Sequence, residues 1–282
     1  MNAIRRTYRY FGRSTLTMAA IVVLLGFVLI GIFAPWLAPY DPNAQNLGMR
    51  LQPPLTDGHL LGTDSLGRDV LSRLIYGSRV SLMVGFSAVL LAAVLGIVIG
   101  LVSGYLGGWV DSLLMRIVDA FLAFPFLLLA IAIVAVLGRG LDNIVIALVI
   151  TGWVLYARLV RGSVLAIRQR EFVDAAIALG RTRWSVLFKH ALPNAIAPII
   201  VQSSLQMAVA ILFAAGLGFL GLGAKPPQPE WGLMLARGRE YLAVAPHVAT
   251  FPGLAIILVV LGFNLLGDGL RDIFDPRLRG SR

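Results

Sequence analysis

Side chains that could carry chemistry are few in this sequence. The chain has no cysteine, and its only lysines are Lys189 and Lys225. A phosphate-binding P-loop needs a Gly-Lys-Ser/Thr sequence, because its lysine helps to hold the phosphates. Lys189 precedes a histidine and Lys225 precedes a proline, so neither completes that motif. The chain is therefore not expected to hydrolyse ATP itself, and any energy from ATP must come from a partner.

The histidines and acids do not form the motif of a membrane protease. None of His59, His190 and His247 precedes a glutamate, so the HExxH zinc motif is absent. A di-aspartyl protease needs two facing acids at membrane depth, and only Asp119 lies inside an expected span. The sequence thus predicts no catalytic residue, no metal ligand and no cofactor in this chain.

A few polar residues lie inside apolar segments and are candidates for a solute pathway or for helix packing. Arg116 and Asp119 are three residues apart on one helical face, close enough to pair. An acid within a span is a functional candidate, but we favour an Arg–Asp pair that only positions its helix. Gln202, Gln206 and Asn264 either join helices or line a path for a polar solute, and both interpretations stay open.

The composition defines the setting of these residues. Of 282 residues, 58% are hydrophobic and only 13% are charged, whereas about a quarter of the residues in a soluble protein are charged. About 20 apolar residues in a row span a bilayer, and this chain has several such runs. We predict an all-α integral membrane protein with six transmembrane helices, at about residues 16–36, 80–102, 113–137, 143–160, 197–219 and 251–266.

The boundaries follow from these runs. The first run is longer than the 7–15 residues of a signal-peptide core, so it is expected to be a retained span. Pro125 is expected to kink the third span. The expected order is a cytoplasmic N-terminus (1–15), the first span, an extracytoplasmic segment (37–79) and a core (80–282) that contains a cytoplasmic loop at 161–196.

A polar, basic segment from Glu171 to Pro193 interrupts the apolar runs. Apolar residues recur at three- and four-residue steps on both sides of Gly180, which predicts two short helical pieces. Glycine tolerates the dihedral angles of a sharp break, so Gly180 is the expected hinge. Pro193 ends the segment, because proline cannot continue a helix without losing a backbone bond. A helix exposed between spans in this way is suited to docking.

This segment resembles the EAA loop in the permeases of ABC importers. The matching positions are Asp174-Ala175-Ala176, Gly180 and Leu192-Pro193. An aspartate replaces the usual glutamate and His190 replaces an isoleucine, and both changes are similar to the peptide and nickel branch. Three further motifs resemble the same branch: Gly62-Thr63-Asp64, Gly67-Arg68-Asp69 and Ser72-Arg73.

The resemblance implies a type I permease fold and a place in an ATP-driven importer. The implied function is import of dipeptides or oligopeptides by alternating access, with nickel or another small solute as the alternative. A secondary transporter that uses Asp119 is a further alternative. The implied partners are a second, homologous permease (a heterodimer), two cytoplasmic ATPase subunits that bind ATP and Mg²⁺, and an extracytoplasmic binding protein.

The resemblance also assigns ATPase coupling to seven residues: Glu171, Asp174, Ala175, Ala176, Gly180, Leu192 and Pro193. Asp174 would offer its carboxylate to an ATPase arginine, since charge-assisted bonds of this kind are strong. The two alanines would allow close docking, and Leu192-Pro193 would direct the return into the fifth span. Glu171 either caps the first helix or is simply solvated.

The net charge of +10 does not indicate nucleic-acid binding, because the basic residues flank the expected spans. With the N-terminus inside and six spans, sixteen of the 24 Lys and Arg residues fall on the inner side. An excess of inner positive charge is typical of inner-membrane proteins. We therefore expect a multi-pass protein of the bacterial cytoplasmic membrane, surrounded by lipid, with both termini and the EAA-like loop in the cytoplasm.

Overall fold

The computed structural model describes residues 15–171, 173, 180 and 192–274. Within these residues the fold is helical, and the only β-type pairs are two isolated bridges, Thr56–His59 and Thr63–Asp69. The longer helices are α2 (Thr15–Ile32), α4 (Val70–Leu106), α5 (Gly108–Leu122), α6 (Phe126–Leu137), α7 (Leu141–Arg168), α10 (Leu192–Phe219) and α12 (His247–Phe274). The short ones are α3 (Ala34–Leu37), η1 (Leu47–Met49), α11 (Trp231–Gly238) and η3 (Arg239–Tyr241).

Five of these helices, α2, α4, α7, α10 and α12, are long and apolar enough to cross a membrane. The number is six if the bent pair α5 and α6 counts as one broken span. Since the backbone groups in a bilayer core must be paired within the protein, an all-helical architecture satisfies this constraint. The predicted all-α membrane fold is confirmed.

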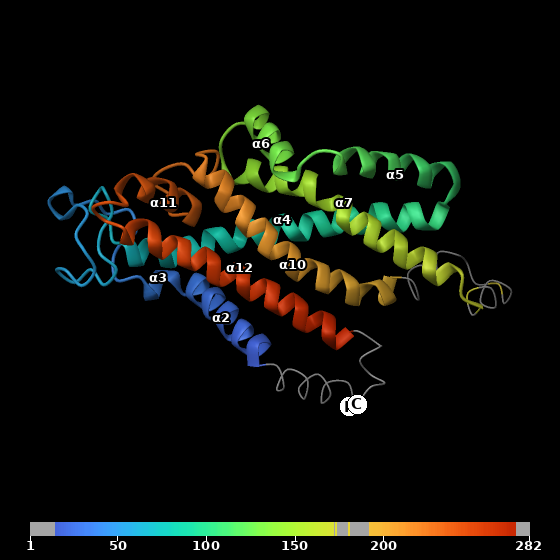
Figure 1. Cartoon of the computed structure of the whole chain (residues 1–282), viewed down its shortest axis with the longest axis horizontal. Helices are drawn as coiled ribbons and strands as arrows, with labels where there is room; N and C mark the ends of the chain where they lie inside the picture. The colour runs from blue at the N-terminus through green and yellow to red at the C-terminus, as the bar shows by residue number, and fades with distance from the viewer. Residues whose placement is uncertain (1–14, 172, 174–179, 181–191, 275–282) are drawn as a thin grey trace.

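The long helices lie side by side in one elongated bundle (Figure 1). Residues 38–69, α3 and α11 gather at one end, which we call the cap end. The end of α7 and the start of α10 lie at the opposite end, which we call the loop end. The start of α2 and the end of α12 also point toward the loop end.

Helix α4 begins ten residues before the expected second span, because Asp69 caps it. The Asp69 carboxylate accepts hydrogen bonds from the backbone N–H of Ser72 at 2.7 Å and from the Ser72 hydroxyl at 2.7 Å. A side-chain acceptor at this position satisfies an N–H group that the helix leaves unpaired. The expected span began only where the sequence becomes apolar, whereas the helix itself begins at the cap.

The expected third span at 113–137 consists of two helices rather than one kinked helix. α5 and α6 meet at 90°, and Pro125 directly precedes the first residue of α6. Proline has no N–H to donate, so it is tolerated at a helix start, whereas inside a helix it removes a backbone hydrogen bond and favours a kink or break. The bend is therefore sharper than the sequence suggested, and α5 lies along the outer side of α7 (Figure 1).

Three glycines bring α4 and α7 into backbone contact. A Cβ atom at Gly96 would lie 2.4 Å from the Trp153 carbonyl oxygen, and one at Gly100 would lie 2.6 Å from the Ala157 carbonyl oxygen. A Cβ atom at Gly104, one turn further along, would lie 2.9 Å from the Val164 Cβ atom and 3.1 Å from the Arg161 carbonyl oxygen. Small residues four apart let membrane helices approach closely. Because the hydrophobic effect does not drive helices together in lipid, van der Waals contact of this kind stabilises the helix pair instead.

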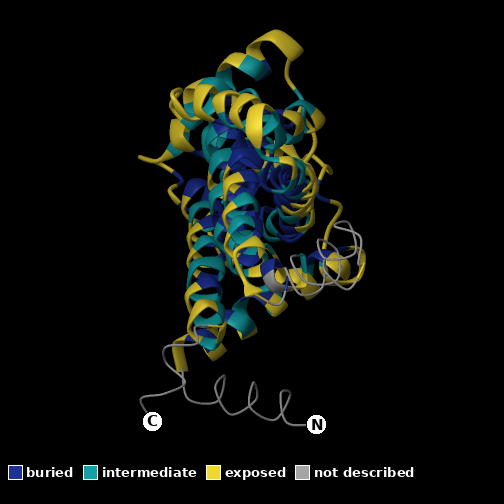
Figure 2. Cartoon of the chain, turned by 90° about the vertical axis from the view of Figure 1, so that its right-hand side faces the viewer, coloured by how far each residue is buried: buried dark blue, intermediate teal, exposed yellow. Residues whose placement is uncertain are grey.

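Burial follows the bundle. In the view of Figure 2 the buried residues gather in the interior, and exposed residues cover the outside. Much of the outside is apolar: Val22, Phe86, Leu128 and Val136 are each more than half exposed. Lipid chains and partner subunits can cover such a surface, whereas exposing so large an apolar surface to water would be unfavourable.

Adding a methyl group at Gly100 is expected to destabilise the bundle. Gly100→Ala places a Cβ atom against the α7 backbone, and overpacking of this kind costs about 1–3 kcal/mol. Gly216→Ala is the matched control, since no atom lies within 4 Å of the added Cβ. The free energy of unfolding of both variants is measured in detergent. Equal stability of the two would show that the α4–α7 contact is not tight.

Candidate functional site

The EAA-like loop lies only partly within the described residues. Asp174, Ala175 and Ala176 fall outside them, so their predicted coupling role stays a prediction. Glu171 is exposed. Gly180 lies in a turn with a φ of +78°, a conformation that glycine adopts at little cost.

The return from this loop begins directly with a helix. Leu192 is the first residue of α10, and Pro193 follows it in an exposed position. Proline is tolerated in the first turn of a helix, because the N–H group that it lacks would be unpaired there. Both residues therefore lie at the loop end, and their coupling role stays a prediction.

The predicted pairing of Arg116 with Asp119 is wrong. The Asp119 carboxylate on α5 instead forms an ion pair with the Arg158 guanidinium on α7. Both side chains are more than half exposed, at 60% for Asp119 and 52% for Arg158. Arg116 is exposed, and among the described residues it has no ion-pair partner. Sequence spacing could find a partner only on the same helix, and the actual partner lies 39 positions away.

A second acid–arginine pair, absent from the sequence-based prediction, attaches α5 to α7. Both carboxylate oxygens of Asp111 accept hydrogen bonds from Arg161, one from Nε and one from Nη2, each at 2.6 Å. The Ser103 hydroxyl of α4 also donates to Asp111. A bidentate Arg–carboxylate pair fixes orientation as well as distance, so this contact holds the start of α5 in place.

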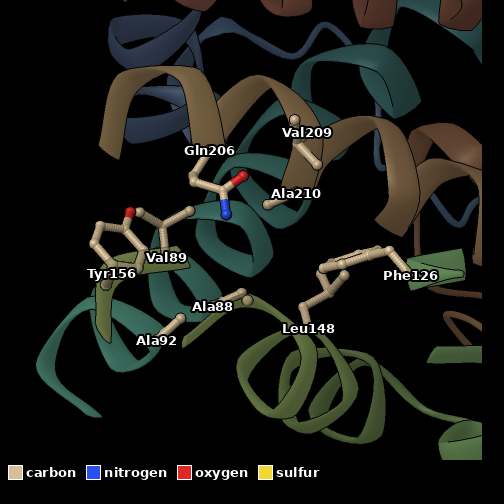
Figure 3. Close-up of a pocket in the computed structure, with 10 residues that line it drawn as sticks. Ala88, Val89, Ala92, Phe126, Leu148, Tyr156, Gln206, Val209 and Ala210 are labelled. Atoms are coloured by element: carbon tan, nitrogen blue, oxygen red, sulfur yellow. The ribbon is translucent and has the colours of Figure 1, made fainter. Parts of the chain in front are cut away.

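Gln206 faces a small cavity between helices. The cavity has a volume of about 20 Å³, enough for roughly one water molecule. Figure 3 shows the Gln206 amide directed into it, with Phe126 and Leu148 at one side and Tyr156 at the other. Gln206 is 7% exposed. Gln206 belongs to α10, and residues of α7 line the same cavity. This position favours the helix-packing interpretation.

Two serines of α10, Ser203 and Ser204, border a larger groove. The Tyr156 hydroxyl of α7 donates to the Ser203 hydroxyl at 3.2 Å. Ser203 also lines a groove of about 910 Å³ between α2, α4, α10 and α12, whose walls are otherwise mostly apolar. Gln202 and Asn264 are half-buried. The structure thus brings Gln206 and Ser203 against α7, but it does not gather the five polar candidates at one place.

A buried charge network organises the cap end. Asp64 accepts from Arg68 Nε at 2.7 Å and forms an ion pair with its Nη2 at 2.6 Å. Arg73 lies 3.6 Å from the same carboxylate, and both arginines are only 2% exposed. The Arg73 Nη1 atom donates to the carbonyl oxygens of Pro42 at 2.8 Å and Pro227 at 3.3 Å. Two distant loops therefore meet at the start of α4.

Removing the Asp64 charge is expected to be costly. Asp64→Asn leaves Arg68 and Arg73 buried without their counter-ion, and breaking a buried pair in this way costs about 3–5 kcal/mol. Asp57→Asn is the control, because Asp57 is exposed. Denaturant unfolding in detergent should separate the two variants. Identical unfolding midpoints would contradict the role of the network.

Glu230 is a second buried acid at this end. Its Oε1 and Oε2 atoms accept from the backbone N–H groups of Gly232 at 2.7 Å and Leu233 at 2.8 Å, which caps α11. The side chain is buried, with 4% exposure for the residue. Burial disfavours the charged carboxylate and raises the pKa of Glu230 from 4.5 to about 7, although the cap bonds act in the opposite direction.

This pKa predicts a pH-dependent stability. The folded protein holds the Glu230 proton more tightly than the unfolded chain. The stabilising contribution is therefore complete below pH 4.5 and is lost as the pH rises through about 7. The loss is on the order of 3 kcal/mol. Glu230→Gln, which stays neutral, should remove this component when wild-type and variant unfolding are compared from pH 4 to 8. Parallel stability curves would contradict the assignment.

No cluster of three or more metal-ligating side chains occurs among residues 15–171, 173, 180 and 192–274.

Comparison with known proteins gives consistent matches over nearly the whole chain. Residues 96–280 match the family described as the binding-protein-dependent transport system inner membrane component. Residues 3–54 match the N-terminal TM domain of oligopeptide transport permease C. The dipeptide transport system permease protein DppC of Alkalihalophilus pseudofirmus is 48% identical over 98% of this chain and 90% of that protein. The glutathione transport system permease protein GsiD of Pectobacterium atrosepticum is 46% identical over 98% of this chain and 91% of that protein.

A solved structure supports the fold. The MetNI methionine ABC transporter, in an inward-facing conformation, contains a chain that matches with a TM-score of 0.59 at 19% identity. The match covers 72% of this chain and 97% of that chain. The bundle thus has the fold of a type I ABC permease, and the relatives identify the chain as a multi-pass membrane transport permease. The chain belongs to the family of binding-protein-dependent transport system inner membrane components.

Proposed function

We propose that this chain is one of two permease subunits of an ATP-driven importer that carries dipeptides or oligopeptides into the cell. The observation that carries the proposal is the pair of relatives that each align with 98% of the chain. Dipeptides and glutathione, which the names of those relatives print, are both short peptides. A shared peptide backbone with charged ends is the chemistry common to both.

The energy for transport comes from partners. The chain lacks the Gly-Lys-Ser/Thr motif of a P-loop, so two cytoplasmic ATPase subunits would bind ATP and Mg²⁺. The EAA-like loop would dock on them. Asp174 would pair with an ATPase arginine, Ala175 and Ala176 would permit close approach, and Gly180 would set the bend. Leu192 and Pro193 at the start of α10 would pass the movement into the membrane.

The remaining components follow the same scheme. A homologous second permease would complete the pathway, and an extracytoplasmic binding protein would deliver the solute to the cap end. The loop end and both termini would lie in the cytoplasm, since the basic residues concentrate there. Alternating access would then expose the pathway to each side in turn as the ATPase subunits close and separate.

Two other functions compete with peptide import. A nickel or other small-solute importer of the same branch would use the same fold and the same coupling loop. A secondary transporter would use Asp119 to bind a coupling ion. The ion pair between Asp119 and Arg158 already provides that acid with a counter-charge, which argues against the second alternative.

Uptake into proteoliposomes distinguishes these functions. The chain is reconstituted with the permease, ATPase subunits and binding protein encoded beside it. We expect ATP-dependent uptake of labelled dialanine, competed by other short peptides and not by nickel ions. Uptake that follows a proton gradient without ATP would indicate a secondary transporter. ATP-dependent uptake of nickel but not of peptide would show that the substrate is nickel rather than a peptide.

Site-specific crosslinking tests the coupling role. The chain has no cysteine, so Glu171→Cys gives a single thiol at the loop end. Leu60→Cys is the control at the cap end, where Leu60 is 56% exposed. A bifunctional thiol reagent should join position 171, but not position 60, to an ATPase subunit, with a yield that changes on ATP binding. A reactive thiol at position 171 that forms no ATPase adduct would refute the coupling role.

A further inference from the structure

The ion pair of Asp119 and Arg158 lies on a face that we do not expect to contact lipid. Both residues lie within the segments that compose the candidate spans: Asp119 in the last turn of α5, next to the break of the bent span, and Arg158 ten residues before the end of α7. More than half of each side chain is exposed on this chain. Ionised side chains at membrane depth face a bundle interior or a water-filled cavity, because contact with hydrocarbon costs several kcal/mol. The face that carries this pair is therefore expected to contact water.

Helix α5 has two exposed stripes that differ in chemistry. Trp109, Leu113 and Ile117 are spaced four apart, and all three are exposed and apolar. Ser112, Arg116 and Asp119 form the neighbouring stripe, which is exposed and polar. Residues three and four apart share one helix face. The apolar stripe is compatible with contact to lipid, whereas the polar stripe is not.

The opposing face of α7 is open. Arg158, Gly162 and Ala166 follow one another at four-residue steps, and all are exposed. A Cβ atom at Gly162 would meet no atom within 4 Å. The polar stripe of α5 therefore lies beside a stripe of α7 in which small residues follow Arg158, which leaves room for a solute beside the ion pair.

The pair also differs from its neighbour in how completely it is bonded. Asp111 and Arg161 form two parallel bonds, Ser103 adds a third, and their side chains are 17% and 32% exposed. Asp119 and Arg158 share one nitrogen–oxygen contact. Within the described part of the chain, the other Asp119 oxygen accepts no hydrogen bond. The Asp111 pair is saturated, whereas the Asp119 pair keeps free bonding capacity on both partners.

We propose that Asp119 and Arg158 form a binding site for the charged ends of a zwitterionic peptide in the translocation pathway. This inference rests on the peptide-import function proposed above. Asp119 takes the peptide ammonium group, and Arg158 takes the peptide carboxylate. Without solute, each residue serves as the counter-ion of the other.

The local charge balance fits this exchange. Arg116, Arg158 and Arg161 outnumber Asp111 and Asp119 in this region, so a carboxylate meets a net positive surface. Arg161 also attracts Asp119 electrostatically. A single-contact, solvent-exposed pair is weak, so its opening costs little compared with the two charge-assisted bonds that the peptide forms.

Substitutions in the two pairs separate binding from structure. Asp119→Asn and Arg158→Gln are compared with Asp111→Asn in the reconstituted transporter. The first two should lower dialanine uptake at low peptide concentration by about tenfold or more, since hydrogen bonds to charged groups contribute at least that factor. They should leave the melting temperature in detergent unchanged. Asp111→Asn should lower the melting temperature, because it releases α5 from α7.

Thiol labelling provides a readout that does not depend on uptake. Ser112→Cys lies on the polar stripe, and Leu113→Cys lies on the adjacent apolar stripe, where the native leucine is 50% exposed. A charged, membrane-impermeant thiol reagent, applied to both sides of the membrane in the complete transporter, should modify position 112 much faster than position 113. Excess dialanine should slow the reaction at position 112.

The outcomes are distinct. Peptide uptake by the wild type together with unchanged uptake by Asp119→Asn and Arg158→Gln would overturn this site while leaving the importer function intact. Equally slow labelling at positions 112 and 113 would mean that lipid or a partner subunit covers the face, which also overturns the site. A wild-type transporter that moves no peptide would refute the proposed function itself, and this site with it.

Discussion

The close contact of α4 with α7 determines where the other elements lie. Gly96 and Gly100 let the two backbones touch, and the bonds that position α5 depend on that contact, because Ser103 of α4 and Arg161 of α7 converge on Asp111. In lipid, apolar surface alone does not drive helices together. Close approach of backbones and a few polar bonds must therefore supply the association, and α4 provides both.

The charged residues divide according to how the protein satisfies them. Asp64 and Arg68 are buried at the cap end and bonded to each other and to the backbone, so their purpose is to hold loops together. Glu230 is buried and forms no ion pair with any residue that the structure describes, and burial moves its pKa toward neutrality. Asp119 and Arg158 are neither buried nor saturated. Of these three arrangements, only the last leaves charge available to a solute.

Much of the fold could be predicted from sequence, because long apolar runs in a chain of this composition have few alternatives to helices. The bend at Gly180 and the break before α6 were also accessible, since Gly and Pro restrict the backbone locally. Contacts between distant segments were not accessible. The partner of Asp119 lies on another helix, and helical spacing carries no information about that helix.

The start of α4 illustrates the same limit. Hydropathy marks where the chain becomes apolar, but Asp69 begins the helix through a hydrogen bond to Ser72. Likewise, nothing in the spacing of Arg73 shows that it contacts the carbonyl oxygens of Pro42 and Pro227. Such contacts depend on how the chain returns to the cap end, which a single sequence without its fold does not reveal.

The length of α4 has a mechanical consequence. Its 37 residues extend about 55 Å at 1.5 Å per residue, well beyond the roughly 30 Å of a hydrocarbon core. One end holds loops from both halves of the sequence through Arg73, and the other leads through Gly107 directly into α5. A tilt of about 10° around its midpoint would displace each end by about 5 Å. The helix is therefore a lever, and a small rotation at one membrane surface becomes an opposite displacement at the other.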